Sequence, residues 1–146
     1  MGWIILTVGC AVVLAGLSVL IHFECLSFLD RWVRRFKSGR TVLVVTMVGL
    51  LSVHIIEIWV YAAAYGLFSF FPELGGLHIA VAGDYAWLDF VYFSAMVYTT
   101  VGFGDIVPSG GIRLITATEA LVGLSLITWS ASFTFLKMQA LFGNKD

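Results

Sequence analysis

The residues best suited to chemistry lie in one short run, Thr100-Val101-Gly102-Phe103-Gly104-Asp105. Backbone carbonyl oxygens can replace the water around a cation when several of them point in the same direction. That arrangement requires alternate residues to adopt a positive φ. Glycine does so without steric cost, so Gly102 and Gly104 fit it. The run, here named the carbonyl loop (residues 100–105), therefore predicts a backbone-lined cation site.

The carbonyl loop of one chain forms only one wall of such a site. The expected ion ligands are the backbone carbonyls of Thr100, Val101, Gly102 and Phe103, with Gly104 completing the loop. The Thr100 hydroxyl is expected to close the inner end, and the side chains of Val101 and Phe103 should turn outward. Four copies are needed to surround an ion, so the chain is predicted to form a homotetramer with cyclic symmetry.

The segments that must position this loop are strongly apolar. The chain has 146 residues, of which 60% are hydrophobic and 12% are charged, and its mean hydropathy is +1.00. A soluble domain carries about 25% charged residues, so this chain is predicted to sit in membrane lipid. A net charge of −1 gives no reason to expect a nucleic-acid partner.

Three segments are long enough to cross the hydrocarbon core, which takes about 20 helical residues. We expect an extra N-terminal helix at 1–29, followed by a pore domain at 41–142 with spanning helices at 41–67 and 112–142. Residues 86–99 are too short to span and predict a re-entrant helix buried against protein, with Asp84 as its N-cap. The predicted fold is an all-α membrane protein with three transmembrane helices, assembled around a central pore.

Charge orients the predicted spans. Every lysine and arginine except Arg113 lies in the loop at 30–40, near the C-terminal end of the last span or beyond it, and these residues are Arg31, Arg34, Arg35, Lys37, Arg40, Lys137 and Lys145. The positive-inside rule therefore places the N-terminus outside, the short tail at 143–146 inside, and the re-entrant segment on the outer side. Because no basic region precedes the first apolar run, this run is expected to be a retained helix of the cytoplasmic (inner) membrane.

In this context, with a short helix before it and a spanning helix after it, the run resembles the selectivity filter of the potassium channel family. The sequence is similar to the short bacterial-type pore-loop channels and differs from their commonest filter only by Phe103 in place of tyrosine. The resemblance covers roughly residues 41–139. It implies a passive potassium channel rather than an enzyme, with K⁺ bound at Thr100, Val101, Gly102 and Phe103. The implied partners are membrane lipids and copies of the chain, and no cofactor is implied besides the permeant ion.

The resemblance also implies residues that support the filter. Asp105 matches the family acid behind the outer mouth, and Tyr92 stands where family members commonly have tryptophan, so a Tyr92–Asp105 hydrogen bond is predicted. Met96 occupies a position where some bacterial relatives have glutamate. Glu119, inside the last span, either replaces that acid as a filter support or makes an ordinary interhelical hydrogen bond.

The last span carries the candidates for gating. Gly123 matches the hinge glycine of the family's inner helix, although a small residue also permits close helix packing. The remaining cavity or gating candidates are Thr99, Leu124, Ile127, Ala131 and Phe135. Phe135 or the nearby Phe133 is expected to narrow the inner end of the pore.

Other polar residues lie within the first two spans. His54 and Glu57 share a helix face, and we expect them to hydrogen-bond to each other or to a neighbouring helix rather than to sense pH. They have too few partners to predict a metal site. The first helix, which contains His22, is expected to pack outside the tetramer against lipid. Cys10 and Cys25 are expected to be free thiols.

Several other functions compete with a selective channel. The alternatives are a weakly selective monovalent cation channel, a potassium-uptake transporter subunit, a non-conducting accessory subunit and a membrane enzyme. Transporters of this kind fuse four pore repeats, whereas this chain contains one. An enzyme built on His54 and Glu57 would lack a nucleophile and its base.

Overall fold

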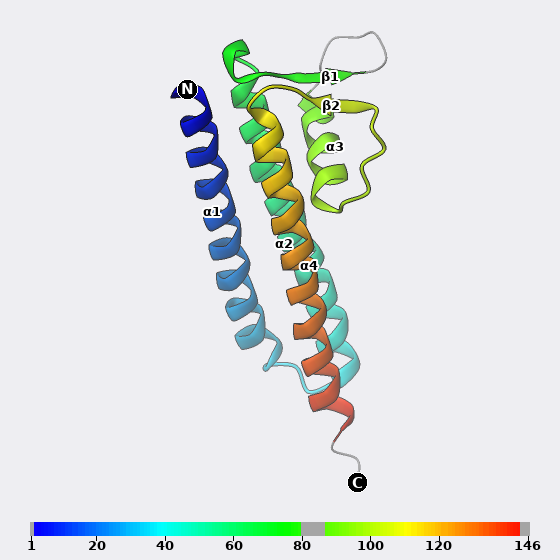
Figure 1. Cartoon of the computed structure of the whole chain (residues 1–146). Helices are drawn as coiled ribbons and strands as arrows, with labels where there is room; N and C mark the ends of the chain where they lie inside the picture. The colour runs from blue at the N-terminus through cyan, green and yellow to red at the C-terminus, as the bar shows by residue number, and fades with distance from the viewer. Residues whose placement is uncertain (1, 80–86, 144–146) are drawn as a thin grey trace.

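The computed structural model describes residues 2–79 and 87–143, and three long helices dominate it (Figure 1). They are α1 (Gly2–Val33), α2 (Gly39–Phe68) and α4 (Ile112–Phe142). Each is long and apolar enough to cross a membrane. A short helix, α3 (Trp87–Tyr98), lies beside one end of the long helices. The predicted all-α membrane fold with three spanning helices and one short helix is confirmed.

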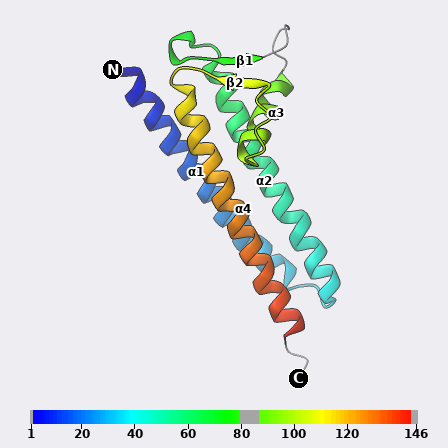
Figure 2. The same ribbon diagram turned by 45° about the vertical axis from the view of Figure 1, so that its right-hand side comes forward.

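The short helix and the first helix pack on the same pair of long helices. α3 contacts both α2 and α4, while α1 runs along α2 and α4. α1 lies on the side of α4 away from α3 in Figure 1 and crosses behind α4 in Figure 2. The buried side chains form two clusters. The one at the α3 end includes Tyr61, Tyr65, Phe90, Phe93 and Ile115, and the other includes Leu26, Leu29, Val33, Val42 and Leu50, with Phe133 packed against it. Both clusters include residues of α1, so this helix is part of the core.

A small sheet that the sequence analysis did not predict lies at the α3 end. After α2 and a 3₁₀ helix, η1 (Pro72–Leu74), the strand β1 (Leu77–Ile79) pairs antiparallel with β2 (Ile106–Pro108), which follows the carbonyl loop. The backbones beside the sheet approach closely. A Cβ atom on Gly75, whose φ is +99°, would lie 2.1 Å from the Ser109 carbonyl oxygen. The exit of the loop is therefore tied to the segment after α2.

The helix ends differ from the expected ranges, chiefly around the basic loop. The loop predicted at 30–40 spans only residues 34–38, because α1 continues to Val33 and α2 begins at Gly39. Asp30 explains the extension. Its carboxylate pairs with Arg34 one turn later at 2.8 Å and also with Lys137 of α4. These ion pairs satisfy the charges of the last turn, so the helix need not end before them.

The other bounds lie closer to the prediction. α4 has the expected range, whereas α2 is slightly longer than 41–67. The first described residue of the short helix is Trp87, so its expected start at 86 and the N-cap at Asp84 lie outside the described residues. The tail beyond Gly143 also lies outside them.

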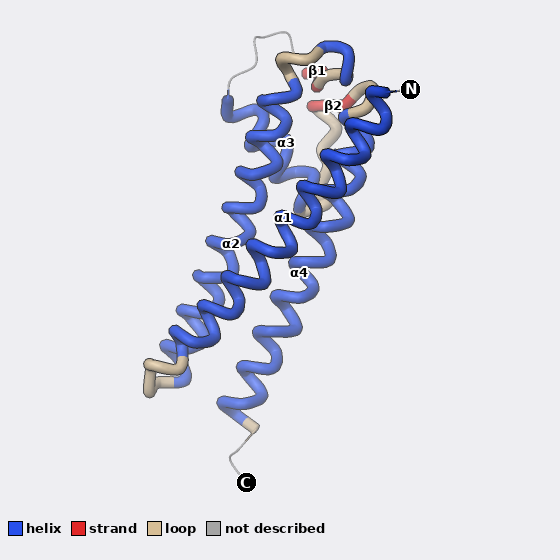
Figure 3. Tube along the Cα trace, turned by 90° about the vertical axis from the view of Figure 1, so that its left-hand side faces the viewer, coloured by secondary structure: helices blue, strands red, loops and turns tan. Residues whose placement is uncertain are grey.

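The two ends of the bundle differ in what they hold. The N-terminus, β1 and β2 lie at one end, and the loop between α1 and α2 lies at the other, close to the C-terminal end of α4 (Figure 3). The carbonyl loop and the basic loop are therefore at opposite ends, as the charge distribution requires. Which end faces the cytoplasm stays a prediction.

Candidate functional site

The carbonyl loop connects the C-terminal end of α3 to β2 and has an alternating backbone. Thr100, Gly102 and Gly104 have φ values of +61°, +53° and +81°. The expected positive φ at both glycines is present. The positive φ of Thr100 was not expected, and its branched side chain makes this conformation costly, on the order of 1–3 kcal/mol. Two backbone bonds hold the start of the loop, from the Thr100 N–H to the Val97 carbonyl at 2.9 Å and from the Gly102 N–H to the Met96 carbonyl at 3.1 Å.

The carbonyl loop is open on one side in the single chain. Val101 and Phe103 are 52% and 72% exposed, and the residues from Thr99 to Asp105 are all exposed. Phe103 also lines a cavity of about 230 Å³ that includes Met96 and Tyr92. An exposed loop of this kind can face symmetry-related copies, and its ion-ligand role stays a prediction.

The outer side of the loop is joined to α3 by a side-chain hydrogen bond. The Tyr92 hydroxyl donates to Asp105 Oδ2 at 2.8 Å. This is the bond that the sequence analysis expected within or between subunits, and it occurs within one chain. Together with the β1–β2 pairing, this bond fixes the C-terminal end of the carbonyl loop.

Glu119 lies in a second, fully buried set of contacts, here named the outer network (Glu119, Tyr65, Ser94). The hydroxyl of Tyr65, from α2, donates to Glu119 Oε2 at 2.5 Å. Ser94 Oγ, from α3, lies 2.5 Å from Glu119 Oε1 and also 2.9 Å from the Ile58 carbonyl oxygen. The interhelical hydrogen bonds that were one of the two alternatives for Glu119 are therefore present. One of them joins Glu119 to α3, the helix that precedes the carbonyl loop.

Proton counting favours one protonation state of the outer network. Ser94 has one hydroxyl proton, but two oxygens lie within its reach. Both contacts are satisfied when Ser94 donates to the Ile58 carbonyl and Glu119 is a neutral acid that donates to Ser94. Glu119 has only hydroxyl partners, so a neutral acid is also the state with the smaller desolvation cost.

Gly123 lies where α4 meets the end of α3. A Cβ atom at this position would lie 2.2 Å from the Tyr98 carbonyl oxygen, a distance that no side chain tolerates. The structure thus favours the close-packing alternative for Gly123, because contact with the α3 backbone already accounts for the glycine. A hinge role is not needed to explain it.

Below the carbonyl loop lies an apolar cavity of about 620 Å³ between α2 and α4. It brings together four of the predicted cavity residues, Thr99, Ile127, Ala131 and Phe135. Leu124 is not among its lining residues and is 53% exposed on α4. Leu124 precedes Ile127 by about one turn of α4, and its role stays a prediction.

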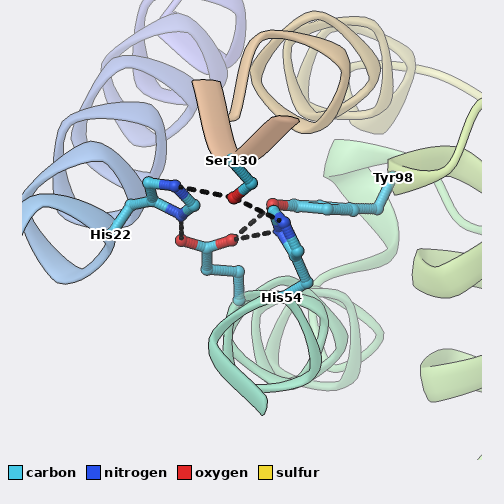
Figure 4. A network of polar contacts seen from close by, with 5 residues as sticks. His22, His54, Tyr98 and Ser130 are labelled. Carbon is cyan, nitrogen blue, oxygen red and sulfur yellow. Dashed lines mark hydrogen bonds and ion pairs between the residues drawn. The ribbon is translucent and has the colours of Figure 1, made fainter. Parts of the chain in front are cut away.

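The most extensive polar contacts lie at mid-height, where side chains from four helices converge (Figure 4). This central network consists of His22 (α1), His54 and Glu57 (α2), Tyr98 (α3) and Ser130 (α4). His22 Nδ1 lies 3.0 Å from Glu57 Oε1 and His54 Nδ1 lies 3.2 Å from Oε2. The Tyr98 hydroxyl donates to Glu57 Oε2. Both Nε2 atoms face Ser130 Oγ, at 3.2 Å for His22 and 3.0 Å for His54.

The predicted contact between His54 and Glu57 is present, but the participation of His22 was not predicted. Because α1 also carries large apolar residues on its exposed faces, the sequence did not mark its packed face. In the structure, the buried residues of α1 recur every three, four or seven positions along one stripe. They are Thr7, Ala11, Ser18, His22, Leu26, Leu29 and Val33. A stripe with this spacing predicts a packed helix face, so α1 is not simply a lipid-facing addition.

Distance alone would allow a metal ion in the central network. His22, His54 and Glu57 present ligand atoms that all lie within 4.8 Å of one another, one residue more than the sequence analysis had counted. However, those same atoms are already hydrogen-bonded to each other and to Tyr98 and Ser130. The network is therefore satisfied without a metal ion.

Comparison with known proteins gives two matches. The family described as "Ion channel" matches residues 53–140, a range of 88 positions (140 − 53 + 1) that runs from α2 to α4 and contains the carbonyl loop. A membrane protein of Bacillus subtilis (strain 168), named "Uncharacterized membrane protein YdjJ", is 39% identical over 57 residues, which are 38% of this chain and 17% of that protein. The match thus spans about a sixth of the relative's length. No solved structure matches the chain.

Proposed function

This chain belongs to the ion channel family, and we propose that it is the subunit of a potassium-selective channel that conducts K⁺ passively as a homotetramer. The observation that carries this proposal is the alternation of positive φ at Thr100, Gly102 and Gly104. An alternating backbone can turn successive carbonyls to one side, as a ring of ion ligands requires. The exposure of the loop in a single chain supports assembly, because three more copies would cover it.

In the proposed mechanism, K⁺ exchanges its water for the carbonyls of residues 100–103 of four subunits. The C-terminal end of α3 meets the start of the loop, and the negative end of its dipole favours a cation there. The Tyr92–Asp105 bond holds the outer end of the loop. The outer network holds α3 against α2 and α4. Glycine positions, rather than side-chain charges, therefore set the ion site.

The proposed orientation places the carbonyl loop at the outer face and the basic loop in the cytoplasm. An ion that has passed the loop would enter the space below it, where Thr99, Ile127, Ala131 and Phe135 line the apolar cavity. Phe135 lies toward the far end of α4 and is 63% exposed. It is the proposed site of an apolar constriction, because dewetting at such a ring can block conduction.

Reconstitution of the full chain in liposomes tests this function. We expect potassium flux down an imposed gradient, a reversal potential in mixed K⁺ and Na⁺ that follows K⁺, and a tetramer by native mass spectrometry. Equal permeability to both ions would assign the chain to weakly selective cation channels. Tetramers without flux would assign it to accessory subunits.

A glycine pair supplies a matched control for the carbonyl loop. Gly102→Ala should abolish K⁺ selectivity, because φ is +53° at this position and alanine is strained there. Gly76→Ala, near β1, should conduct like the unmodified protein, since nothing lies within 4 Å of the added Cβ and its φ is ordinary. Equal selectivity of the two variants would contradict the proposed role of the loop.

A further inference from the structure

The central network buries a carboxylate in the middle of the membrane-spanning bundle. Glu57 and His22 are completely buried. Within residues 2–79 and 87–143, no lysine or arginine is bonded to Glu57, whose partners are His22, His54 and Tyr98. An ionised group at this depth needs a compensating charge. Among the described residues, the two imidazoles are the only groups bonded to Glu57 that can supply it.

The hydrogen-bond geometry determines how many protons the network holds. Tyr98 gives its single proton to Glu57, so His54 Nδ1 faces two acceptor oxygens and must itself carry a proton. When Glu57 is ionised, His22 Nδ1 also faces an acceptor oxygen and must carry a proton as well. Ser130 has one hydroxyl proton, which satisfies one of the two Nε2 atoms that face it. The contact to the other Nε2 is a hydrogen bond only if that nitrogen is also protonated.

One of the two histidines is therefore an imidazolium, and its charge balances that of Glu57. Ser130 can move this charge between the two rings. It accepts the Nε2 proton of one imidazolium while giving its own proton to the Nε2 of the other ring. No proton is gained or lost in that exchange, and the net charge of the network stays zero.

We propose that the central network is a binding site for one proton, shared by His22 and His54 through Ser130, and that this proton couples α1 to the pore. Its loss would leave Glu57 without a counter-charge and loosen the contact between α1 and α2. Tyr98, the last residue of α3, would then lose its fixed acceptor. Because Thr99 and the carbonyl loop follow directly, conduction should depend on occupancy of this site. That last step rests on the proposed channel function, whereas the proton site does not.

His54 is the member of the central network that a proton can reach from the adjoining cavity. His54 has a side chain that is 14% exposed, and it lines the cavity of about 620 Å³. A proton arriving through this cavity reaches His54 first and can pass to His22 through Ser130. His22 itself has no exposed surface.

Other titratable groups surround the site without bonding to it. Cys25 lies one turn further along α1 and Glu24 is exposed beside it. From α2, the Tyr61 hydroxyl is buried without a hydrogen-bond partner among the described atoms. From α4, Glu119 is occupied in the outer network. Titration of the central network should therefore appear as a one-proton event.

The Trp129 ring provides a readout that does not require conduction. Its centroid lies 5.4 Å from that of His22, so the charge on the imidazole acts directly on the indole π-system. We expect the tryptophan fluorescence of the purified full chain to change with pH in one transition with a Hill slope of one. Trp129→Phe should remove this transition, and His22→Gln should remove it while Trp129 is retained.

Two further variants keep the test decisive if His22→Gln folds poorly. Ser130→Ala removes the group that links the two Nε2 atoms and should change the proton concentration at the midpoint about tenfold. His78→Gln, at an exposed histidine that contacts Ser109 at the β1–β2 end, should leave the transition unchanged.

Four results would overturn the proposal in whole or in part. An unaltered transition in His22→Gln and Ser130→Ala would place the titrating group elsewhere. A transition that EDTA removes and Zn²⁺ restores would assign the site to a metal. A fluorescence transition accompanied by pH-independent flux would refute the coupling to the pore. A fluorescence transition without K⁺ flux at any pH would refute the channel function while leaving the proton site intact.

Discussion

Glu57 and Glu119 are both fully buried in helices that pack on α3, yet their surroundings differ in kind. Glu119 is surrounded by hydroxyl groups, from Tyr65 and Ser94. Glu57 receives one hydroxyl bond, from Tyr98, and otherwise faces two imidazoles. Hydroxyls cannot carry a compensating charge, whereas imidazoles can. The outer network is therefore an uncharged set of hydrogen bonds between helices, and the central network is an ion pair that can gain or lose a proton.

The difference indicates what each network can contribute. A neutral acid among hydroxyls has little reason to change state, so the outer network should hold α3 in place under all ordinary conditions. A histidine–carboxylate centre can change its protonation state because each imidazole can gain or lose a proton at its second nitrogen. Glu119 thus holds α3 in position, whereas Glu57 belongs to a network that can respond to protonation.

The largest expected difference in stability between the two networks comes from changing their glutamates to glutamine. Glu57→Gln should lower the free energy of unfolding by about 3–5 kcal/mol, because it leaves a buried imidazolium without its partner. Glu119→Gln should cost about 1 kcal/mol or less, because an amide can donate to Ser94 and accept from Tyr65 as the neutral acid does. Unfolding of the purified chain in mixed micelles measures both values. Equal losses would abolish the distinction between the two networks.

A smaller effect is expected for the two tyrosines that donate to these glutamates. Tyr98→Phe removes a bond to a charged carboxylate and should cost about 1.5–3 kcal/mol, whereas Tyr65→Phe removes a bond to a neutral acid and should cost about 0.5–1.5 kcal/mol. The same unfolding measurement compares them. A larger loss for Tyr65→Phe would show that Glu119, too, is ionised.

The smallest effect is expected outside both networks. Lys137→Met breaks the pairing between α4 and Asp30 of α1 at the end of the bundle. Both side chains are partly exposed, at 19% and 27%, so the loss should be about 0–1 kcal/mol. A loss as large as that of Glu57→Gln would mean that α1 is held at its end rather than at its centre.

Local pattern was enough to predict the three long apolar helices, the short helix and the positive φ of Gly102 and Gly104. Apolar runs give helix length directly, and Gly102 and Gly104 mark backbone that other residues adopt with difficulty. The Tyr92–Asp105 bond was predicted from the family resemblance, which matched both residues to positions that support the filter. By contrast, the positive φ of Thr100 carries no residue-type signal.

Contacts between distant segments could not be derived in the same way. His22 and Glu57 are 35 positions apart, and their meeting depends on the register between two helices. That register is set by packing along the whole α1 stripe. The three-residue strands β1 and β2 are too short to show an alternating pattern. Their pairing depends on α2 and α4 already lying side by side.

The pairing of β1 with β2 also has a consequence for the conformational freedom of the carbonyl loop. It joins Leu77 to Pro108 and so closes a ring of chain that contains α3 and the carbonyl loop. Closing such a ring costs conformational entropy. The carbonyl loop is therefore held at both of its ends, by α3 on one side and by the sheet on the other.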